Sequence, residues 1–494
     1  MNPSGLLTAL LLSILGAATP TFAESKQGPQ RPNILFCMAD DWGWPHASAY
    51  GDEGLQTPHF DRLAREGVLF QHAFTTSPSC TPSRNAVITG KYHWQLGPGA
   101  NLWSSLPAEH ESFIHILRDK GYLTGRNRPK SWGPGRIQSW VEHHGDHPVT
   151  TQYKTLDEFL ENTRAGGEKP FFFWLATSDP HRGFKKGSGE KSGLDPAKAH
   201  LFDHYPDVPE VRGDVADYYF EVQRWDSLVG SALKLLEEKG LLENTLVIMT
   251  GDHGMPFPRC KGNLYDSGVR VPLAMRWGKG IPSGRTIEDF VSFADLAPTL
   301  LTVAGVEIPK DMTGRSFADL LHSKESGVLA PETRSHVVFG RERHTPAQEK
   351  PNMGGYPSRG IRDREFLYIR NYQPDWWPAG TDGKGGTNIP GQWYSDCDGG
   401  PTKNYIIENR DKDEVHRTSF ELCFGKRPAE ELYHLATDPD QVRNVAGDPK
   451  FREDLARLRT RLEKDLKALH DPRVKDPGYT GFDAHPYYGG GVGR

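Results

Sequence analysis

The sequence predicts an α/β protein in which a large, mostly parallel β-sheet is sandwiched between helices and followed by a smaller C-terminal α+β region. The first observation is that strongly apolar segments of strand length alternate with amphipathic segments of helix length. The second is that the strand segments are apolar on both faces, which is typical of parallel sheets buried beneath two helical layers. The third is a change near residue 335 to hairpin-like patterns, which predict an antiparallel sheet.

The large sheet is expected to contain strands at residues 33–38, 68–74, 171–177 and 245–250. The amphipathic segments between them predict helices at residues 57–67, 111–120 and 214–239. A glycine ends or directly follows each helical segment, as expected where a helix terminates in a left-handed residue. Parallel strands need crossover connections, and these place the helices on the faces of the sheet.

The C-terminal region is expected to hold a hairpin at residues 361–370, a strand at residues 431–435 and an amphipathic helix at residues 451–469. Residues 376–400 are rich in glycine and aromatic side chains and predict a long loop. We therefore divide the chain into an export signal at residues 1–23, a main domain at 24–335 and a C-terminal subdomain, an antiparallel sheet with a terminal helix, at 336–494.

The N-terminal residues have the features of a signal peptide. Residues 6–18 form an apolar run without a charged side chain, which is too short for a membrane-spanning helix of about 20 residues. Thr21-Phe22-Ala23 then supplies small residues at the positions that a signal peptidase reads. We expect cleavage after Ala23 and a secreted or periplasmic protein. No later apolar run approaches the length of a membrane span, so no membrane span is expected in the mature chain.

The composition is that of a soluble globular protein, with 36% hydrophobic and 25% charged residues. A formal net charge of -5 is close to balanced for this length, so neither a nucleic acid nor an anionic membrane surface is expected as a partner. Five cysteines are too few for a disulfide scaffold. Cys397 and Cys423 could pair in an oxidising compartment, whereas Cys37 lies in a predicted strand and is expected in the core.

Polar clusters fall directly after the predicted strands of the large sheet. Asp40 and Asp41 follow the first strand, and Asp252 with His253 follows the strand at residues 245–250. His181 stands a few residues beyond the strand at 171–177. Because the carboxyl ends of parallel strands share one edge of a sheet, we expect these residues to converge on one pocket there.

The segment Cys80-Thr81-Pro82-Ser83-Arg84 has a distinct chemical pattern. Proline favours the first turn of a helix, which places Cys80 at or just before a helix N-terminus. Unpaired backbone N–H groups and the positive end of the helix dipole attract negative charge there. Arg84 lies one turn further on and faces the same end. The segment predicts a nucleophile in an anion-binding site, although a pattern this short also occurs where a buried cysteine precedes a surface arginine.

Several motifs occur together in an order and spacing that resemble the type I sulfatases. They are RPNILF at 31–36 with Asp40-Asp41, CTPSR at 80–84, GYLTG at 121–125 with Lys130, GDHG at 251–254, and ELYHL at 431–435 with Asp438-Pro439. The resemblance covers nearly the whole chain after the export signal. It implies an alkaline phosphatase-like α/β fold with the catalytic domain at residues 24–335. Within the family, the chain looks most similar to the heparan N-sulfatase (sulfamidase)-like branch, through DPHR at 179–182 and MPFP at 255–258 with Asn263-Leu264-Tyr265.

The resemblance implies that a separate formylglycine-generating enzyme oxidises Cys80 to formylglycine. The aldehyde would hydrate to a geminal diol, in which one hydroxyl attacks sulfur and deprotonation of the other expels sulfate. A plain cysteine offers no second group of this kind. The implied activity is a sulfohydrolase that releases sulfate from sulfated saccharides, as an O-sulfate ester or an N-sulfate.

The resemblance also assigns Asp40, Asp41, Asp252 and His253 as ligands of a divalent metal, with the modified Cys80 as a fifth. Adjacent carboxylates repel each other and are costly to bury without a cation, which favours a metal site over a solvated acidic loop. The family usually has asparagine at the position of His253 and binds calcium through oxygen atoms. Imidazole suits manganese, iron or zinc better. Calcium is expected by analogy, with manganese or another transition metal as the alternative.

The resemblance also implies roles for the side chains that would surround the sulfate group. Lys130 and Lys261 match the sulfate-binding lysines, and Arg84 matches the arginine that braces the diol. His181 matches the histidine that protonates the leaving oxygen or nitrogen. The family commonly has a second histidine where this chain has Trp132. Either the first histidine serves both proton-transfer steps, or a histidine elsewhere substitutes; the candidates are His143, His144 and His147.

Two other functions are compatible with the sequence. The superfamily also includes formylglycine-dependent phosphonate monoester and phosphodiester hydrolases, and the Asp252-His253 pair resembles some of these. A non-catalytic, glycan-binding protein with the sulfatase fold is the second alternative, motivated by Trp132. Such a protein would have no use for Cys80 and its neighbouring ligands. Glycosaminoglycan, ulvan-like and other algal polysaccharide fragments all remain open as sources of the sulfated sugar.

Overall fold

The structure, a computed structural model, describes residues 31–128, 131, 151–167, 169–384, 386, 388 and 393–489 together with Met1. An eight-stranded sheet within these residues has the order β4-β3-β5-β1-β6-β7-β2-β8. Its strands are β1 (Asn33–Ala39), β2 (Val68–Phe74), β3 (Leu123–Arg126), β4 (Thr151–Gln152), β5 (Phe171–Ala176), β6 (Thr245–Gly251), β7 (Leu273–Arg276) and β8 (Arg285–Ser292). Only the pairs that involve β7 are antiparallel. The mostly parallel sheet predicted from the sequence is confirmed.

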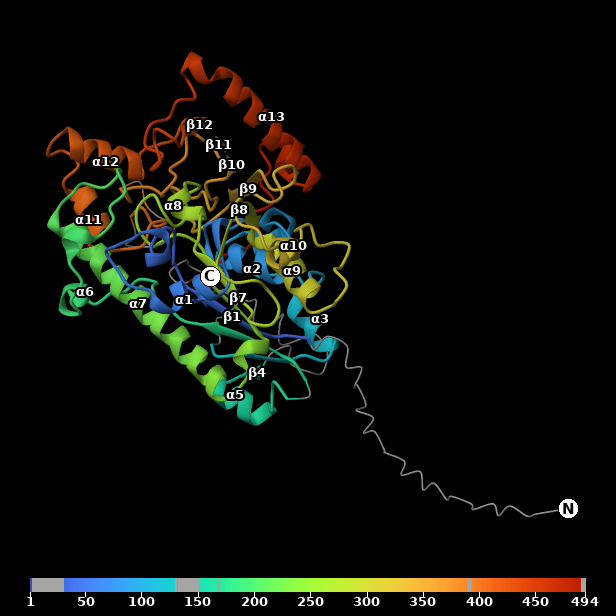
Figure 1. The fold of residues 1–494 in the computed structure, drawn as a ribbon. Coiled ribbons are helices and arrows are strands. Elements are labelled where there is room, and N and C mark those ends of the chain that lie inside the picture. The colour runs from blue at the N-terminus through green and yellow to red at the C-terminus, as the bar shows by residue number, and fades with distance from the viewer. Residues whose placement is uncertain are drawn as a thin grey trace. The chain divides into compact units, whose positions relative to one another are not determined.

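The helices associated with this sheet cover both of its faces (Figure 1). One face is covered by α1 (Pro58–Glu66), α5 (Leu156–Thr163) and α7 (Pro209–Glu238), and the other by α2 (Cys80–Thr89), α3 (Phe113–Asp119), α9 (Leu296–Val303) and α10 (Ala318–His322). Two short helices, α6 (Ser188–Lys191) and α8 (Asp266–Val269), lie in the connections. Helix α7 begins at Pro209 rather than at the expected Asp214, because proline has a dihedral angle suited to the first turn and lacks an N–H that would go unpaired there.

Alternate residues of β1 pack into two different hydrophobic cores. Leu35 and Cys37 belong to the core that also contains side chains of α1 and α7. Phe36 and Met38 belong to the core built with α2, α3 and α9. This two-sided burial explains why the strand reads as a continuous apolar run, and it confirms Cys37 as a core residue. All five cysteines are free thiols in the structure.

The C-terminal region contains a four-stranded antiparallel sheet in the order β12-β11-β10-β9. Its strands are β9 (His336–Arg341), β10 (Ser358–Asp363), β11 (Phe366–Asn371) and β12 (Glu430–His434), and its helices are α11 (Pro401–Glu408), α12 (Glu414–Phe424) and α13 (Arg452–Ala468). Helix α13 covers one face of this sheet, where its residues Leu458, Leu462 and Leu466 pack in the core. Phe339 and Ile369 on the other face pack with the ends of β2 and β8. The small sheet therefore lies directly against the edge of the large sheet that contains β2 and β8.

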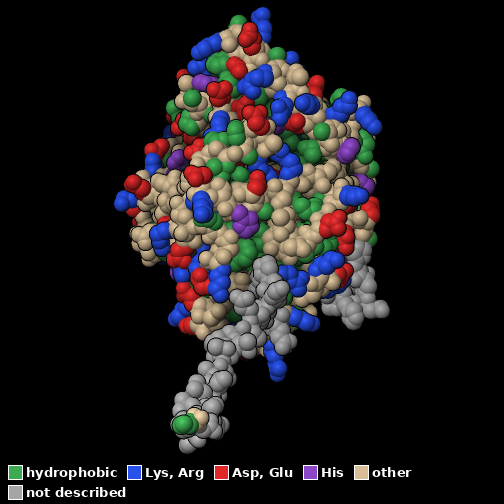
Figure 2. Space-filling view, turned by 45° about the vertical axis from the view of Figure 1, so that its right-hand side comes forward, with side chains coloured by type: hydrophobic (Ala, Val, Ile, Leu, Met, Phe, Trp, Pro, Cys, Tyr) green, Lys and Arg blue, Asp and Glu red, His purple; other side chains and the backbone are tan. Residues whose placement is uncertain are grey.

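The surface is consistent with the nearly balanced charge. On the face drawn in Figure 2, acidic and basic side chains are interspersed and do not gather into a large patch of one sign. In the part of the chain that the structure describes, no helix combines the length and the apolar character needed to cross a lipid bilayer. The proposed signal peptide at residues 1–23 falls outside the described residues, apart from Met1.

Candidate active site

Three neighbouring strands bring together the polar residues that were expected at one edge of the sheet. Strands β5, β1 and β6 lie side by side and parallel, so their carboxyl ends share an edge. Asp40 and Asp41 follow β1, while Asp252 and His253 follow β6. The segment after β5 leads to His181, whose Nε2 atom lies 3.8 Å from Oδ2 of Asp41. The expected convergence is therefore present in the structure.

Asp252 and His253 stand between two glycines that leave no room for a side chain. A Cβ atom at Gly251 would lie 2.0 Å from the carbonyl oxygen of Trp42. One at Gly254 would lie 1.9 Å from another backbone oxygen. The close approach of these backbones buries both polar side chains completely, at 0% exposure. The spacing of the GDHG motif thus has a steric cause.

Cys80 is the first residue of α2, as predicted from the proline two positions later. Its Sγ atom lies 3.2 Å from Nε2 of His253 and 4.0 Å from Oδ1 of Asp41. Burial raises the pKa of the Cys80 thiol well above its ordinary value, and the positive charge of Lys261 opposes this only partly. The unmodified side chain is therefore a neutral thiol near pH 7, and a neutral thiol is a poor nucleophile.

Arg84 joins helix α2 to two of the acidic residues. Its Nε donates a hydrogen bond to Oδ2 of Asp252 at 2.9 Å, and Nη2 lies 3.2 Å from Oδ1 of Asp40. A third bond runs from Nη1 to the carbonyl oxygen of Ser131 at 2.9 Å. Arg84 is 2% exposed, and a guanidinium buried this deeply requires such carboxylate partners. Its predicted contact with the modified residue 80 stays a prediction.

The acidic residues are packed so closely that their charges interact. The backbone N–H of Asp41 donates to Oδ1 of Asp252 at 2.9 Å, and Asp41 adopts a left-handed φ of 71° to do so. Burial raises the pKa of Asp40 against the opposing charge of Arg84, and the two neighbouring carboxylates raise it further. Burial also acts on Asp252, but His253 and then Arg84 hold its pKa below the usual range.

The geometry of His253 leaves a ring nitrogen directed at the carboxylates. Nδ1 lies 3.0 Å from the carbonyl oxygen of Gly254, which can only accept, so Nδ1 carries the hydrogen. In the neutral ring Nε2 then holds a lone pair, 3.3 Å from Oδ1 of Asp41 and 3.6 Å from Oδ1 of Asp252. Oδ1 of Asp40 is also buried, and Nη2 of Arg84 lies 3.2 Å from it. An imidazole nitrogen and several carboxylate oxygens that converge in this way are ligands that suit a divalent cation.

Lys261 fills a second cluster next to this one. Its Nζ atom donates to Oδ2 of Asp41 at 2.9 Å and lies 3.0 Å from Oδ2 of Asp398. His181 completes the cluster, and its Nδ1 donates to the carbonyl oxygen of Arg182 at 2.8 Å. The Nε2 atom of His181 therefore faces the site. The lysine and histidine that were predicted to act on the sulfate group lie beside the same carboxylate.

Sequence reasoning missed three residues of the site. Asp398 comes from the glycine-rich loop of the C-terminal region, and no local pattern marked it. His344, which follows β9, is buried, and its Nδ1 shares a hydrogen bond of 2.8 Å with Oγ of Ser79. Tyr218 on α7 places its hydroxyl 3.3 Å from the N–H of Gly43 and supports the loop after β1. The predicted helix could have suggested Tyr218 only as a core residue.

Some predicted positions lie outside the described residues. They are the predicted sulfate-binding Lys130, the unusual Trp132 and the candidate substitutes His143, His144 and His147.

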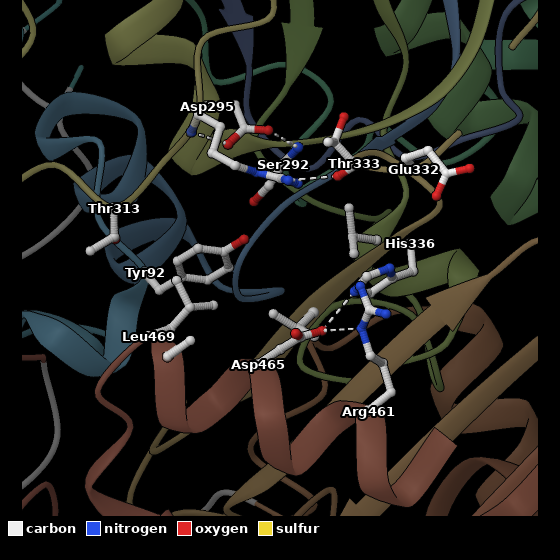
Figure 3. Close-up of a pocket in the computed structure, with 14 residues that line it drawn as sticks. Tyr92, Ser292, Asp295, Thr313, Glu332, Thr333, His336, Arg461, Asp465 and Leu469 are labelled. Carbon is white, nitrogen blue, oxygen red and sulfur yellow. Dashed lines mark hydrogen bonds and ion pairs between the residues drawn. The ribbon is translucent and has the colours of Figure 1, made fainter. Parts of the chain in front are cut away.

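A separate cavity of about 290 Å³ lies where α13 meets the main domain (Figure 3). None of the predicted site residues lines it. Asp465 of α13 points toward His336 and Arg461, at 2.6 Å from Nε2 of the histidine and 3.2 Å from Nε of the arginine. The carboxylate of Asp465 is thus paired within the protein, and the cavity forms part of the seam between the two sheets.

Two family matches agree with this arrangement. Residues 32–306 match the sulfatase family, and residues 251–375 match the C-terminal region of N-sulphoglucosamine sulphohydrolase. The first match covers more than half of the 494 residues. The chain therefore belongs to the sulfatase family, and it is a hydrolase of sulfate esters or N-sulfates.

Individual relatives extend over most of the chain. It is 30% identical over 498 residues to human N-sulphoglucosamine sulphohydrolase, which covers 90% of this chain and 92% of the relative. It is also 30% identical over 452 residues to an ulvan-active sulfatase of Formosa agariphila, with 88% and 79% covered.

Solved structures share the fold. A protein in complex with its substrate D-glucosamine-2-N,6-O-disulfate has a TM-score of 0.62 at 20% identity, covering 90% of this chain and 100% of that one. The phosphonate monoester hydrolase of Agrobacterium radiobacter has a TM-score of 0.63 at 19% identity, covering 89% and 96%. At these identities the likeness extends to the fold alone.

Proposed function

We propose that this protein releases sulfate from sulfated saccharides through Cys80 matured to formylglycine, with a divalent metal beside it. The observation that carries the proposal is the place of Cys80, at the N-terminus of α2 and 3.2 Å from Nε2 of His253. The buried, neutral thiol is a poor nucleophile in that position. Formylglycine would supply an aldehyde whose hydrate offers one hydroxyl for attack and another for the release of sulfate.

Asp40, Asp41, Asp252 and His253 would hold the metal, which supplies positive charge beside the sulfuryl oxygens and makes a bound hydroxyl more acidic. The three carboxylates suit calcium, the ion that follows from the resemblance to the family. The imidazole nitrogen of His253 suits manganese or another divalent transition metal better. Arg84 holds two of these carboxylates in place through its contacts with Asp40 and Asp252.

The chain's other charged residues act on the sulfate and the leaving group. Lys261 carries a buried ammonium 2.9 Å from Oδ2 of Asp41 and would bind a sulfuryl oxygen. Lys130 is proposed to bind the sulfate in the same way. Lys261 lowers the pKa of His181, but Asp41 and the other carboxylates raise it above its ordinary value. The imidazolium can then donate its Nε2 proton to the leaving oxygen or nitrogen.

The substrate class follows from the relatives. One is named for N-sulphoglucosamine and another for ulvan, so both an amino-sugar N-sulfate and O-sulfates of a polysaccharide are candidates. We propose a secreted or periplasmic protein, cleaved after Ala23, that is matured by a formylglycine-generating enzyme. Residues 24–335 are proposed as the catalytic domain and residues 336–494 as the C-terminal subdomain.

The first test is mass spectrometry of the peptide that contains Cys80, after co-expression with a formylglycine-generating enzyme. The expected result is the mass of formylglycine and reaction of the peptide with a hydrazide. Cys37, buried in β1, is the internal control and should remain a thiol. Unmodified Cys80 beside an active maturation enzyme would overturn the proposal and favour a glycan-binding protein.

A second candidate activity is hydrolysis of phosphonate monoesters or phosphodiesters. The imidazole of His253 beside Asp252 is the observation that favours it, because this donor pair suits a transition metal. Sulfate and phosphonate esters share a tetrahedral centre and differ mainly in charge. Rates on matched aryl sulfate and aryl phosphonate substrates distinguish the two, and we expect the sulfate to be hydrolysed faster.

A further inference from the structure

Asp398 brings a fixed negative charge into the active site from the C-terminal region. Its Oδ2 atom is buried and lies 3.0 Å from the ammonium of Lys261. One ligand atom each of Asp398, His181 and Asp41 lies within 4.8 Å of the others. The Asp398 side chain as a whole is nevertheless 29% exposed. The side chain of His181, the proposed proton donor, is 37% exposed, so solvent reaches both side chains.

The loop that carries Asp398 is fixed on its N-terminal side. The carboxylate of Asp396 accepts hydrogen bonds from the N–H and the hydroxyl of Thr345, at 2.7 and 2.6 Å. The Nζ atom of Lys403 donates to the carbonyl oxygen of Cys397 at 2.7 Å and to two further carbonyl oxygens of the loop. Thr345, Asp396, Cys397 and Lys403 are all buried. These contacts therefore fix the position of the Asp398 side chain.

The same loop is tied on its C-terminal side to the segment that carries His181. A Cβ atom at Gly400 would lie 2.4 Å from Cζ of Arg182, so the loop backbone rests on that guanidinium. Arg182 forms a bidentate pair with Asp214 at 2.7 Å for both contacts. The hydroxyl of Thr402 donates to the same carboxylate at 2.7 Å. These contacts fix the spacing between the acidic side chain and the histidine.

Asp398 is ionised in this environment. Burial acts to raise the pKa of its carboxyl group, but the adjacent Lys261, followed by His181 and His344, holds that pKa below the usual range. A substrate in the site therefore meets a positive charge on Lys261 and a negative charge next to it. The pair can distinguish an anion from a hydrogen-bond donor across a short distance.

We propose that Asp398 selects the saccharide by the group that neighbours the scissile sulfate, an inference that rests on the proposed function. A hydroxyl or amino group on a nearby carbon of the same sugar donates a hydrogen bond to the carboxylate of Asp398. A second sulfate in place of that group would lie close to the negative charge of Asp398 and be repelled by it. In a partly buried site this repulsion is strong enough to disfavour the disulfated sugar by at least about tenfold.

The test compares two pairs of substrates on the matured enzyme. One pair is D-glucosamine 2-N-sulfate and D-glucosamine 2-N,3-O-disulfate, and the other is D-glucosamine 6-O-sulfate and its 4,6-di-O-sulfate. The variants are Asp398→Asn and, as a charge-matched control, Asp411→Asn, whose side chain is 87% exposed. Asparagine keeps an acceptor oxygen but removes the charge. We expect the ratio of kcat/KM between monosulfated and disulfated sugar to fall at least about fivefold in Asp398→Asn only.

The ratio separates substrate selection from damage to the site. Any disturbance of Lys261 changes the rates on both members of a pair together, so it leaves their ratio unchanged. An unaltered ratio in Asp398→Asn, or no discrimination by the wild-type enzyme, would overturn the inference while the proposed function stands. Failure of the wild-type enzyme to release sulfate from any of the four sugars would likewise overturn the inference. If it also releases no sulfate from ulvan fragments, the proposed function is overturned as well.

Discussion

The Nε2 atom of His253 lies 3.2 Å from the Sγ atom of Cys80, although 173 positions separate the two residues in the chain. The strand β6 brings the imidazole to the edge of the sheet, and α2 brings the sulfur to the same point with its N-terminus. The imidazole nitrogen, a carboxylate cluster and the proposed nucleophile therefore lie next to one another. This relationship defines both the proposed chemistry and the metal that the site would prefer.

Replacing His253 with asparagine should change the metal preference of the site. The amide offers an oxygen in place of the imidazole nitrogen, and oxygen ligands favour calcium over transition metals. We expect the ratio of manganese to calcium bound at equilibrium to fall about tenfold or more in His253→Asn. Elemental analysis of protein dialysed against an equimolar mixture of the two ions measures this directly. An unchanged ratio would show that His253 is not a ligand.

Cys80→Ala should abolish turnover and leave the fold intact. The alanine cannot be converted to formylglycine, so the residual rate should be at least about a thousandfold lower. Cys423→Ala is the matched control, because this cysteine is also buried but lies away from the site. Sulfate release and the thermal unfolding midpoint should both be measured. Substantial activity in Cys80→Ala would exclude the proposed nucleophile.

Asp252→Ala should lower both the metal content and the rate. The substitution removes a proposed ligand and also leaves the buried guanidinium of Arg84 without its partner at 2.9 Å. Loss of one member of a buried ion pair costs about 3–5 kcal/mol in the free energy of unfolding. Asp252→Asn keeps the shape of the side chain and separates the two effects. Full metal stoichiometry in both variants would contradict the ligand assignment.

Asp226 should make the stability of the protein fall as the pH rises from about 4 to about 7. Burial raises the pKa of this carboxyl group to about 7, even though it accepts hydrogen bonds from the N–H groups of His59 and Phe60 at the start of α1. A group with a raised pKa in the folded state stabilises fully below its unfolded pKa. That contribution is lost as the pH rises through the folded value.

Asp226→Asn tests this pH dependence, because the amide is neutral throughout the range. A shift of about three pKa units corresponds to at most about 4 kcal/mol. We expect the free energy of unfolding of the variant to vary less between pH 4 and pH 7 than that of the wild type, as measured by urea unfolding. Asp411→Asn, an exposed carboxyl, should keep the wild-type slope. Equal slopes for all three proteins would contradict the prediction.

The local sequence pattern was sufficient to predict the architecture and the central residues of the proposed site. The apolar run of β1 and the β-branched run of β6 predicted buried parallel strands, and such strands have their carboxyl ends at one edge. The polar residues that follow them were therefore expected to meet, and they do. The start of α2 at Cys80 could also be predicted, because Pro82 favours the backbone conformation of the first turn of a helix.

The sequence by itself was enough to identify the family, to predict the large sheet and to single out Cys80, Asp41 and Asp252. These residues have a local signature, because they stand directly after a strand or at the start of a helix. Only the tertiary structure decided which side chains from distant parts of the chain contact one another in the site. That Asp398 lies beside Lys261 depends on how the C-terminal sheet packs against the main domain and on the anchoring of an irregular loop. Such long-range packing has no period and no motif, since the contacts that fix a loop come from residues scattered along the whole chain.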